Sequence, residues 1–405
     1  MYLREKSQHI KVVIIMHSEL TQRWLDYFCL DTLTEHFDLE YWDCSDFVLP
    51  GFHFDKQIER DYVKKIHTNY EFWQNLRRLP KDTLISNDVH FNKTNYIFHR
   101  LLSHYFPKIN YINFYANNPD NSAVIKESDT PDIQAEPSFI QRVKRVLYRN
   151  KFIMYTIKYL THPSKKYREE LFAPITWDMY EFHNISCAVG EKYHINHPDV
   201  EAYLKYRNTP DNGRGKYMVY IDQFFPIHPD FKEQYPSLDV ENAAVAFYRS
   251  MNRFFDRVEK KYQCKIIIAA HPLSNFRGNP YNGREMVINR TAELVSQCSG
   301  VLMHSSNALS YAMLFRKPIL MLVNAPIECA ETYYNTIVNT SRKYAIPMVD
   351  TDTEQEIDIH TLDDESYRSY CTTYFGDIDT GKIVPNSILL PKYLEQVWHD
   401  IYDNQ

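Results

Sequence analysis

The stretches that decide the fold read KIIIAAHP over residues 265–272 and VLMHSSNALSYAMLF over residues 301–315. The first run is short, β-branched and nearly continuous up to Ala270, which is typical of a strand buried on both faces. The second begins with three apolar residues, and a helical pattern follows over 308–315. Pro318 ends that pattern, and a further apolar run occupies 319–323. Strand, helix and strand with short connections predict a parallel α/β unit.

Polar residues stand where two of these predicted strands end. His271-Pro272 follows the first strand, and Ser305-Ser306 follows the second. Ligands of parallel sheets bind beyond the carboxyl ends of the strands, so we expect these residues, at neighbouring strand ends, to share one site. Taken singly, a Ser-Ser pair is often an ordinary helix cap, and a His-Pro pair is often only a turn.

A phosphate suits these residue types. The first turn of a helix leaves backbone N–H groups unpaired and carries a positive partial charge, so it holds an anion without a metal. Ser305 or Ser306 can cap the helix while the other hydroxyl donates to a phosphate oxygen. His271 can donate a further hydrogen bond, which is stronger when the ring is protonated.

Composition sets the bounds of this hypothesis. The chain has 405 residues, of which 44% are hydrophobic and 24% charged, enough for two globular domains. Its net charge of −6 argues against general nucleic-acid binding. No run approaches the roughly 20 apolar residues of a membrane span, and no secretory signal opens the chain. Seven scattered cysteines without a CxxC pair predict reduced core thiols of a cytosolic protein.

Glycine is scarce, and this excludes two common nucleotide-binding motifs. The chain has 9 glycines, and its only GxG, at residues 213–215, precedes a predicted strand instead of following one. A dinucleotide fingerprint and a P-loop are therefore absent. Metal is not predicted either, because His194 with His197, and His99 with His104, lack partner ligands at recognisable spacing.

Strand and helix patterns alternate along the whole chain and predict two α/β domains with a cleft between them. We expect an N-terminal domain over 1–200, a linker near 196–215, a nucleotide-sugar domain over 201–389 and a C-terminal helix over 390–405 that can cross back to the first domain. The predicted elements are strands at 12–16, 39–42, 83–86, 111–115, 185–189, 217–221, 265–270, 301–303, 319–323 and 346–349, and helices at 56–79, 94–105, 240–262, 308–315 and 330–343.

A basic, aromatic-rich insertion is predicted at 138–168. It contains no acidic residue, and its apolar residues recur at helical spacing among nine Lys and Arg residues. A solvated helix packed by one face is one interpretation. A second is peripheral attachment to an anionic membrane surface, where each basic residue contributes about 1 kcal/mol. A third is a groove for an anionic polysaccharide.

The segment 265–323 resembles bacterial sialyltransferases and polysialyltransferases, and related capsule glycosyltransferases that use CMP-activated sugars. His271-Pro272 and Ser305-Ser306 carry the resemblance. It implies the GT-B arrangement, in which two Rossmann-like domains with parallel sheets face a central cleft. It also implies that His271 assists the leaving CMP phosphate, that Ser305 and Ser306 hold this phosphate, and that no metal or other cofactor is needed. Pro272 and Asn307 belong to the predicted nucleotide-binding set with their motifs.

The resemblance does not identify the general base, because the Asp/Glu-Asp/Glu-Gly motif that supplies it in several of these families is absent from residues 1–200. An inverting transfer needs a carboxylate or histidine within reach of the acceptor hydroxyl. By position at strand ends the candidates are His17, Glu19, Asp88 and, less well, Glu191. Asp88 is the first choice, although Asn-Asp after a strand is as often a simple turn.

Two acidic residues of the second domain complete the candidate site. Asp222 ends a predicted strand, and because phosphate would repel a carboxylate, we expect Asp222 to contact sugar hydroxyls or the acceptor. Glu328 follows the strand at 319–323 and can accept hydrogen bonds from ribose hydroxyls, or it is a solvated loop residue.

The leading hypothesis is therefore metal-independent, inverting transfer of a sialic acid, another nonulosonic acid or Kdo from a CMP donor to a cell-surface oligosaccharide, polysaccharide or glycolipid. The expected location is the cytoplasm, including the inner face of a bacterial inner membrane. A CDP-polyol phosphotransferase and a nucleotide-sugar epimerase are alternatives, although Ser306-Asn307-Ala308 lacks the Gly-rich turn expected of the epimerase. A non-catalytic glycan-binding or scaffold protein is the alternative from another class.

Overall fold

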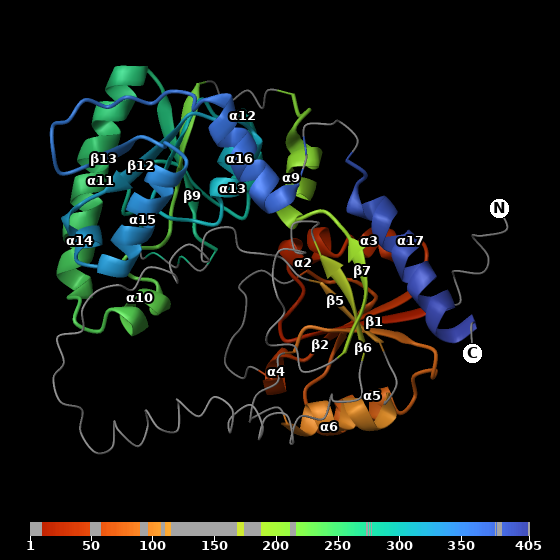
Figure 1. Cartoon of the computed structure of the whole chain (residues 1–405). Coiled ribbons are helices and arrows are strands. Elements are labelled where there is room, and N and C mark those ends of the chain that lie inside the picture. Colours follow the sequence, from red (N-terminus) through yellow and green to blue (C-terminus); the bar gives the residue numbers. More distant parts are fainter. Residues whose placement is uncertain are drawn as a thin grey trace, which may run out of the picture. The chain divides into compact units, whose positions relative to one another are not determined.

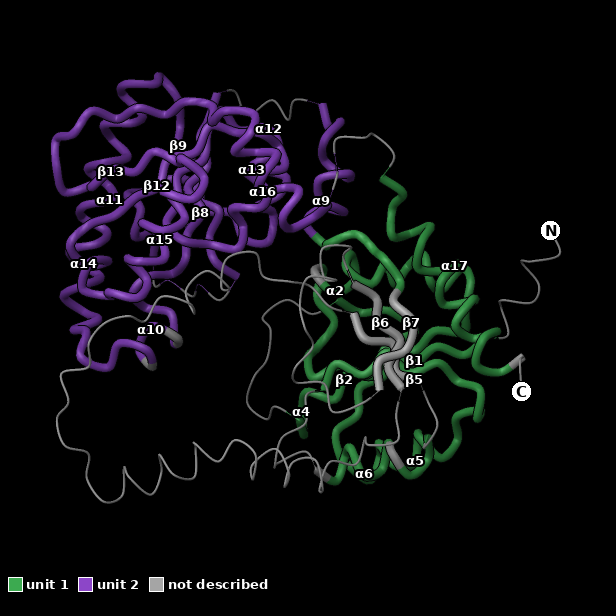
Figure 2. The backbone as a smooth tube through the Cα atoms, in the orientation of Figure 1, with its two compact units in different colours: residues 1–116, 129–198, 383–405 green, residues 117–128, 199–382 purple. Residues whose placement is uncertain are grey.

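The structure of the chain is a computed structural model, and it describes residues 10–48, 58–89, 96–106, 110–114, 168–173, 188–210, 216–272, 274, 276, 278–376, 378 and 383–403. Two compact units divide these residues (Figure 2). Unit 1 holds the described residues up to Pro198 together with 383–403, and unit 2 holds those from Asp199 to 378.

Unit 1 is built on a parallel sheet of seven strands in the order β3-β2-β1-β4-β5-β6-β7. From β1 the chain adds β2 and β3 on one side, and β4 to β7 extend the sheet on the other, so the strand order reverses between β1 and β4. The strands are β1 (Lys11–Met16), β2 (Asp38–Asp43), β3 (Val63–Lys65), β4 (Leu84–Asn87), β5 (Asn110–Phe114), β6 (Arg168–Ala173) and β7 (Ala188–His194).

Helices cover both faces of this sheet (Figure 1). The alternation of side chains along β1 explains why, because Val12 and Ile14 enter one buried cluster while Val13 and Ile15 enter another. The helices are α2 (Gln22–Tyr27), α3 (Leu30–Leu33), α4 (Ser45–Val48), α5 (Asn69–Leu76), α6 (Tyr96–Tyr105) and α17 (Asn386–Trp398), which continues into the π-helical turn η2 (His399–Asp403).

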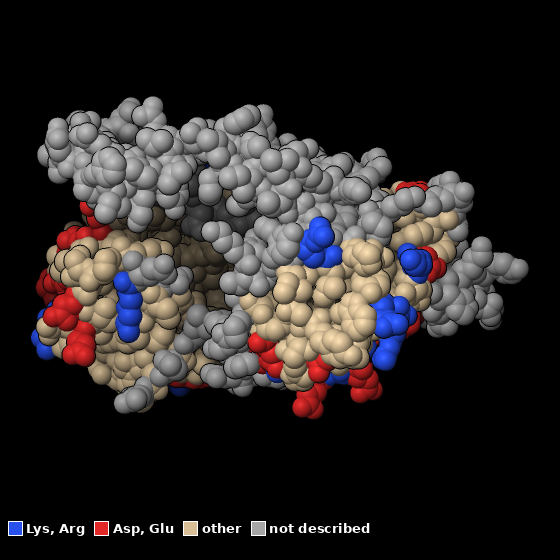
Figure 3. Space-filling model, turned by 90° about the horizontal axis from the view of Figure 1, so that it is seen from below, with Lys and Arg blue, Asp and Glu red and all other residues tan. Residues whose placement is uncertain are grey.

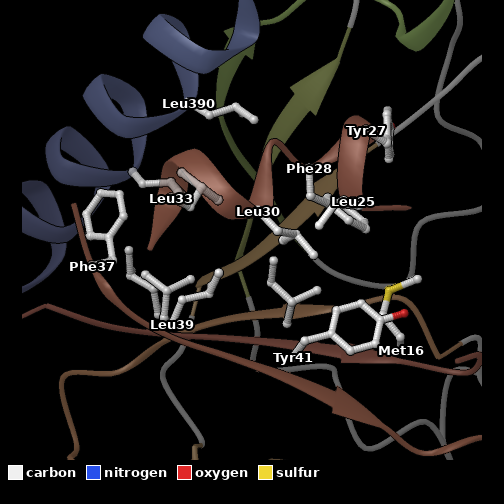
Figure 4. Close-up of a cluster of buried hydrophobic side chains, with 14 of the residues drawn as sticks. Met16, Leu25, Tyr27, Phe28, Leu30, Leu33, Phe37, Leu39, Tyr41 and Leu390 are labelled. Carbon is white, nitrogen blue, oxygen red and sulfur yellow. The ribbon is translucent and has the colours of Figure 1, made fainter. Parts of the chain in front are cut away.

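The helix α17 comes from the end of the chain but belongs to the core of unit 1. Leu390, Leu394 and Val397 are at most 1% exposed and join the cluster that contains β1. Figure 4 shows Leu390 beside Leu33 of α3 in this cluster. The other face of the sheet packs on α5 and α6, where Phe72 stacks on Phe98 with ring centroids 4.3 Å apart.

Unit 2 has a parallel sheet of six strands in the order β10-β9-β8-β11-β12-β13. Its strand order reverses between β8 and β11. The strands are β8 (Tyr217–Ile221), β9 (Lys265–Ala270), β10 (Met286–Ile288), β11 (Val301–Met303), β12 (Ile319–Val323) and β13 (Met348–Asp350). The helices are α9 (Pro198–Tyr206), α10 (Pro229–Gln234), α11 (Val240–Tyr262), α12 (Thr291–Gln297), α13 (Leu309–Leu314), α14 (Ala325–Glu328), α15 (Glu331–Lys343) and α16 (Asp364–Phe375).

These two sheets confirm the predicted fold class of two Rossmann-like domains with parallel sheets. Several local predictions were wrong. The stretch 56–79, predicted as one helix, contains strand β3 and the shorter helix α5, and the predicted linker at 196–215 contains helix α9. Strands β6 and β10 and helix α12 were not predicted. The predicted insertion at 138–168 lies outside the described residues except for Arg168, which begins β6.

The described surface carries both signs of charge. On the side seen in Figure 3, Lys and Arg as well as Asp and Glu appear on each unit. No described helix is long and apolar enough to span a bilayer. The six described cysteines are free thiols, and of these Cys44, Cys298 and Cys371 are buried.

Candidate functional site

The carboxyl ends of three adjacent strands, β9, β8 and β11, place the predicted residues of unit 2. His271 follows β9 and Ser305-Ser306 follows shortly after β11, but β8 lies between these two strands. The prediction that the two motifs stand at neighbouring strand ends was therefore wrong by one strand. Gln223, two residues after β8, closes the gap, because its side-chain Nε2 donates to Ser306 Oγ at 2.8 Å.

Ser306 does not cap the following helix, so this part of the prediction was wrong. Helix α13 has only six residues, and its capping position is Ala308, which provides no side-chain cap. Ser306 Oγ instead accepts from the backbone N–H of Ala308 at 3.2 Å, in a turn that precedes the helix. With Gln223 and Ala308 as donors, both acceptor positions of this oxygen are used. The hydroxyl hydrogen of Ser306 therefore remains as a donor.

Ser305 is placed by a tyrosine of helix α15. Its backbone carbonyl accepts from the hydroxyl of Tyr333 at 3.1 Å, and its side chain is half-buried. His304, the preceding residue, is fully buried, and its Nδ1 lies 2.6 Å from the carbonyl oxygen of Leu322 in β12. Burial lowers the pKa of His304 to about 4, so its ring is neutral near pH 7. His304 thus links β11 to β12. Contacts with a phosphate are left to Ser305 and Ser306.

His271 meets a second histidine that sequence reasoning missed. The ring of His228 packs edge-to-face on that of His271, with centroids 4.9 Å apart and an interplanar angle of 89°. His228 lies in the loop that follows β8, and both rings are half-buried. The available signal was a repeated dipeptide, because His228-Pro229 has the same form as His271-Pro272.

Asp222 is buried, and protein donors occupy one of its two carboxylate oxygens. It is 1% exposed, and its Oδ1 accepts from the backbone N–H of Phe224 at 2.9 Å and from the hydroxyl of Tyr281 at 2.9 Å. Burial raises the pKa of this carboxyl, and hydrogen bonds from Tyr281 and from the backbones of Phe224 and His271 oppose the rise. The prediction that Asp222 contacts sugar hydroxyls or the acceptor does not fit this geometry.

The remaining predicted residues of unit 2 lie at the surface. Pro272 and Asn307 are exposed beside His271 and Ser306. Glu328 is exposed at the end of α14, which follows β12, one strand beyond β11.

In unit 1, two of the candidate bases form a pair where the strand order reverses. His17 follows β1 and Asp88 follows β4, which is the neighbouring strand. His17 Nδ1 lies 3.0 Å from Asp88 Oδ2 and 3.1 Å from the Asp88 carbonyl oxygen. Both partners are acceptors, so Nδ1 carries the proton and Nε2 of the neutral ring keeps its lone pair. The hydrogen bond that His17 donates to the carboxylate of Asp88 raises the pKa of His17, although partial burial opposes the rise.

The other acidic candidates of unit 1 are less suited to be the base. Glu19 is 2% exposed and lies 3.6 Å from Lys65 Nζ, which is also 3.4 Å from Asp46. A base needs access to its substrate, which this burial denies. Glu191 lies in β7, and its side chain is outside what the structure describes. Among the described residues no group of three or more His, Cys, Asp and Glu side chains is arranged to hold a metal ion.

The sequence matches no family model and no curated protein sequence. Solved structures with a similar chain course include the spinosyn forosaminyltransferase SpnP, with 12% identity over 96% of this chain and 99% of that chain at a TM-score of 0.42. The glycosyltransferase SnogD from Streptomyces nogalater has 11% identity over 96% and 100% at 0.44. A UDP-GlcNAc 2-epimerase from Methanocaldococcus jannaschii has 10% identity over 96% and 99% at 0.43. Likenesses at this level carry no argument about function.

Proposed function

We propose that the protein is a glycosyltransferase that moves a sugar from a nucleotide-activated donor to a hydroxyl of a glycan acceptor. The observation that carries the proposal is the His17–Asp88 pair, because Asp88 holds the proton of the neutral ring on Nδ1 and leaves the Nε2 lone pair for a substrate, on a partly exposed side chain at the switch point of a Rossmann-like sheet. Such a nitrogen is a general base for an alcohol, and Asp88 fixes its tautomer and stabilises the imidazolium that forms.

In the proposed reaction, His17 of unit 1 acts on the acceptor, and the donors at the strand ends of unit 2 act on the nucleotide. His17 Nε2 takes the proton of the acceptor hydroxyl, and the hydroxyl oxygen attacks the anomeric carbon of the donor sugar. The bond between that carbon and the phosphate oxygen breaks, and the nucleotide leaves with the electron pair. Donors in unit 2 that strengthen their hydrogen bonds to this developing charge lower the barrier. Ser306 is one of them, since its hydroxyl hydrogen requires an acceptor partner.

The donor is proposed to be CMP-linked, with a sialic acid, another nonulosonic acid or Kdo as the sugar. This assignment rests on the resemblance of residues 265–323 and on the imidazole and hydroxyls at the strand ends of unit 2. An oligosaccharide, polysaccharide or glycolipid is the proposed acceptor. No residue of the proposed mechanism requires a metal. Attachment to an anionic membrane through 138–168 stays a prediction, since that segment lies outside the described residues.

The substitution His17→Ala tests the base. We expect kcat for transfer from a CMP-sugar to fall by about 10²- to 10⁴-fold, the usual contribution of a general base, while the dissociation constant of CMP stays unchanged. The matched control is His36→Ala, because His36 is half-buried in the same unit but precedes β2, at the opposite edge of the sheet. Equal transfer rates of His17→Ala and the wild type would contradict the proposal that His17 is the general base.

The substitution Ser306→Ala tests the phosphate contact. Removing the hydroxyl deletes one donor to the nucleotide phosphate and leaves Gln223 and the Ala308 N–H without their acceptor. We expect the increase in melting temperature produced by saturating CMP to shrink, because ligand stabilisation follows the ratio of ligand concentration to Kd. A preference of the wild type for UDP or GDP over CMP would change the proposed donor and leave the transferase proposal in place.

A further inference from the structure

Two loops of unit 2 bring their histidines together, and one buried carboxylate holds both loops. We propose that His228 is a second imidazole that binds the phosphate of the nucleotide beside His271, and that Asp222 is the positioning residue of this pair. The inference rests on the proposed function in that the anion is taken to be a nucleotide phosphate. It gives roles to one residue that sequence reasoning missed and to one that it misassigned.

The loop after β8 is folded to fix the place of His228. Phe224 has φ of 55°, a left-handed conformation that bulky residues rarely adopt. The backbone N–H groups of Ile227 and His228 both donate to the carbonyl oxygen of Phe224, at 2.9 and 2.8 Å. The chain therefore turns back on itself within five residues, from Phe224 to His228.

An aromatic cluster supports this loop and connects it to the serine motif. Phe225 is fully buried, and its ring lies 4.9 Å from that of Phe231 and 5.9 Å from that of Tyr333. Tyr333 in turn donates its hydroxyl hydrogen to the carbonyl oxygen of Ser305. The loop that carries His228 and the loop that carries Ser305 thus pack on the same aromatic cluster, which fixes their positions relative to each other.

Asp222 connects the two histidine loops. Its Oδ1 accepts from the backbone N–H of Phe224, at the start of the His228 loop, and the nearby backbone of His271 helps to hold down the pKa of this carboxyl. Tyr281 supplies a second donor to Oδ1 at 2.9 Å. A buried carboxylate is costly unless it is hydrogen-bonded, so its presence under both loops favours a role in their placement.

The chemistry of the three groups is complementary to one phosphate. Two imidazoles and the hydroxyl of Ser306 all donate, and a terminal phosphate offers three acceptor oxygens. The carboxylate of Asp222 lies beneath this surface: it is 1% exposed, and its Oδ1 already accepts from Phe224 and Tyr281. A second imidazole near the leaving phosphate also spreads the negative charge that develops as the sugar departs.

The test compares the binding of CMP with that of cytidine by titration calorimetry, in buffer with EDTA so that no metal contributes. The substitution His228→Gln keeps a polar side chain and removes the imidazole. We expect it to weaken CMP binding about tenfold, the loss of one hydrogen bond to a charged group, and to leave cytidine binding unchanged. The matched control is His360→Gln, because His360 is exposed and lies far from the strand ends that carry His228. Its neighbour Ile359 packs against Gly300, just before β11 begins, at the opposite edge of the sheet.

Substitutions of Asp222 separate positioning from general stability. Asp222→Asn keeps an oxygen that can accept from Phe224 and Tyr281, so we expect it to retain part of the CMP affinity that Asp222→Ala loses. In both variants the loss should concern CMP and not cytidine. If Asp222 only stabilised the fold, CMP and cytidine would lose affinity together, and that result would overturn the positioning role.

The outcomes distinguish this inference from the function on which it rests. Unchanged CMP affinity in His228→Gln would overturn the inference and leave the transferase in place. If the wild type prefers UDP or GDP, the same comparison with that nucleotide and its nucleoside decides the role of His228. Failure of the wild type to bind CMP, CDP, UDP and GDP would overturn both.

Discussion

His17 and Asp88 make the proposed reaction dependent on pH in a direction that the geometry fixes. A protonated His17 cannot act as the base, so kcat/KM should fall as the pH drops through its pKa, which the hydrogen bond that His17 donates to Asp88 raises above 6.5. In Asp88→Asn the carboxylate no longer stabilises the imidazolium. We therefore expect the acidic limb of the pH profile to move to lower pH, which initial rates from pH 5 to 9 will measure.

The same pair predicts a change in stability with pH. Because the pKa of His17 is higher in the folded chain than in the unfolded chain, the pair stabilises the fold fully below about pH 6.5 and loses this contribution as the pH rises through the raised value. Asp88→Asn should cost more unfolding free energy at pH 5.5 than at pH 8.5. An equal cost at both values would contradict the role assigned to Asp88.

The sequence predicts single residues at strand ends well, because an apolar run that stops at a polar residue marks the carboxyl edge of a buried strand. His271, Ser306 and Asp88 were found in this way. The order of strands in a sheet leaves no such mark, so the position of β8 between β9 and β11, and with it Gln223, could not be predicted. The burial of Asp222 depends on Tyr281, 59 positions further along the chain.

At the level of elements, α17 offers a sharp test of the core of unit 1. Leu394 is 1% exposed in the cluster that contains β1. Leu394→Ala should lower the free energy of unfolding of unit 1 by about 2–5 kcal/mol, through lost burial and the cavity left behind. The four described tryptophans belong to unit 1, so urea unfolding followed by tryptophan fluorescence reports on this unit.

The control lies on the same helix. Ile388 is 60% exposed, and Ile388→Ala should change stability by no more than about 0.5 kcal/mol. If both substitutions had the same small effect, α17 would not be part of the core of unit 1.

Two short edge strands, β3 and β10, were missed. Strand β3 reads Val63-Lys64-Lys65 and is an edge strand with two exposed lysines, so it carries no run by which to recognise it. Its neighbour α5 has a clear helical pattern, and the two were merged into one predicted helix. Strand β10 is also an edge strand of three residues.

At the scale of the whole molecule, alternation of strand and helix patterns is enough to predict two parallel sheets, because parallel strands need crossover helices. The reversal of strand order in each sheet, which places the candidate residues, is a property of long-range pairing. It follows from neither periodicity nor composition.

The assignment of α17 to unit 1 has a consequence for synthesis. The hydrophobic interior around β1 lacks Leu390, Leu394 and Val397 until α17 has left the ribosome. Unit 2 has all of its described residues within 199–378, so it can complete its own fold first, although it is translated later. Unit 1, whose first strands are translated before unit 2, thus completes its core only after α17 has been made, and its uncovered strands are prone to aggregation until then.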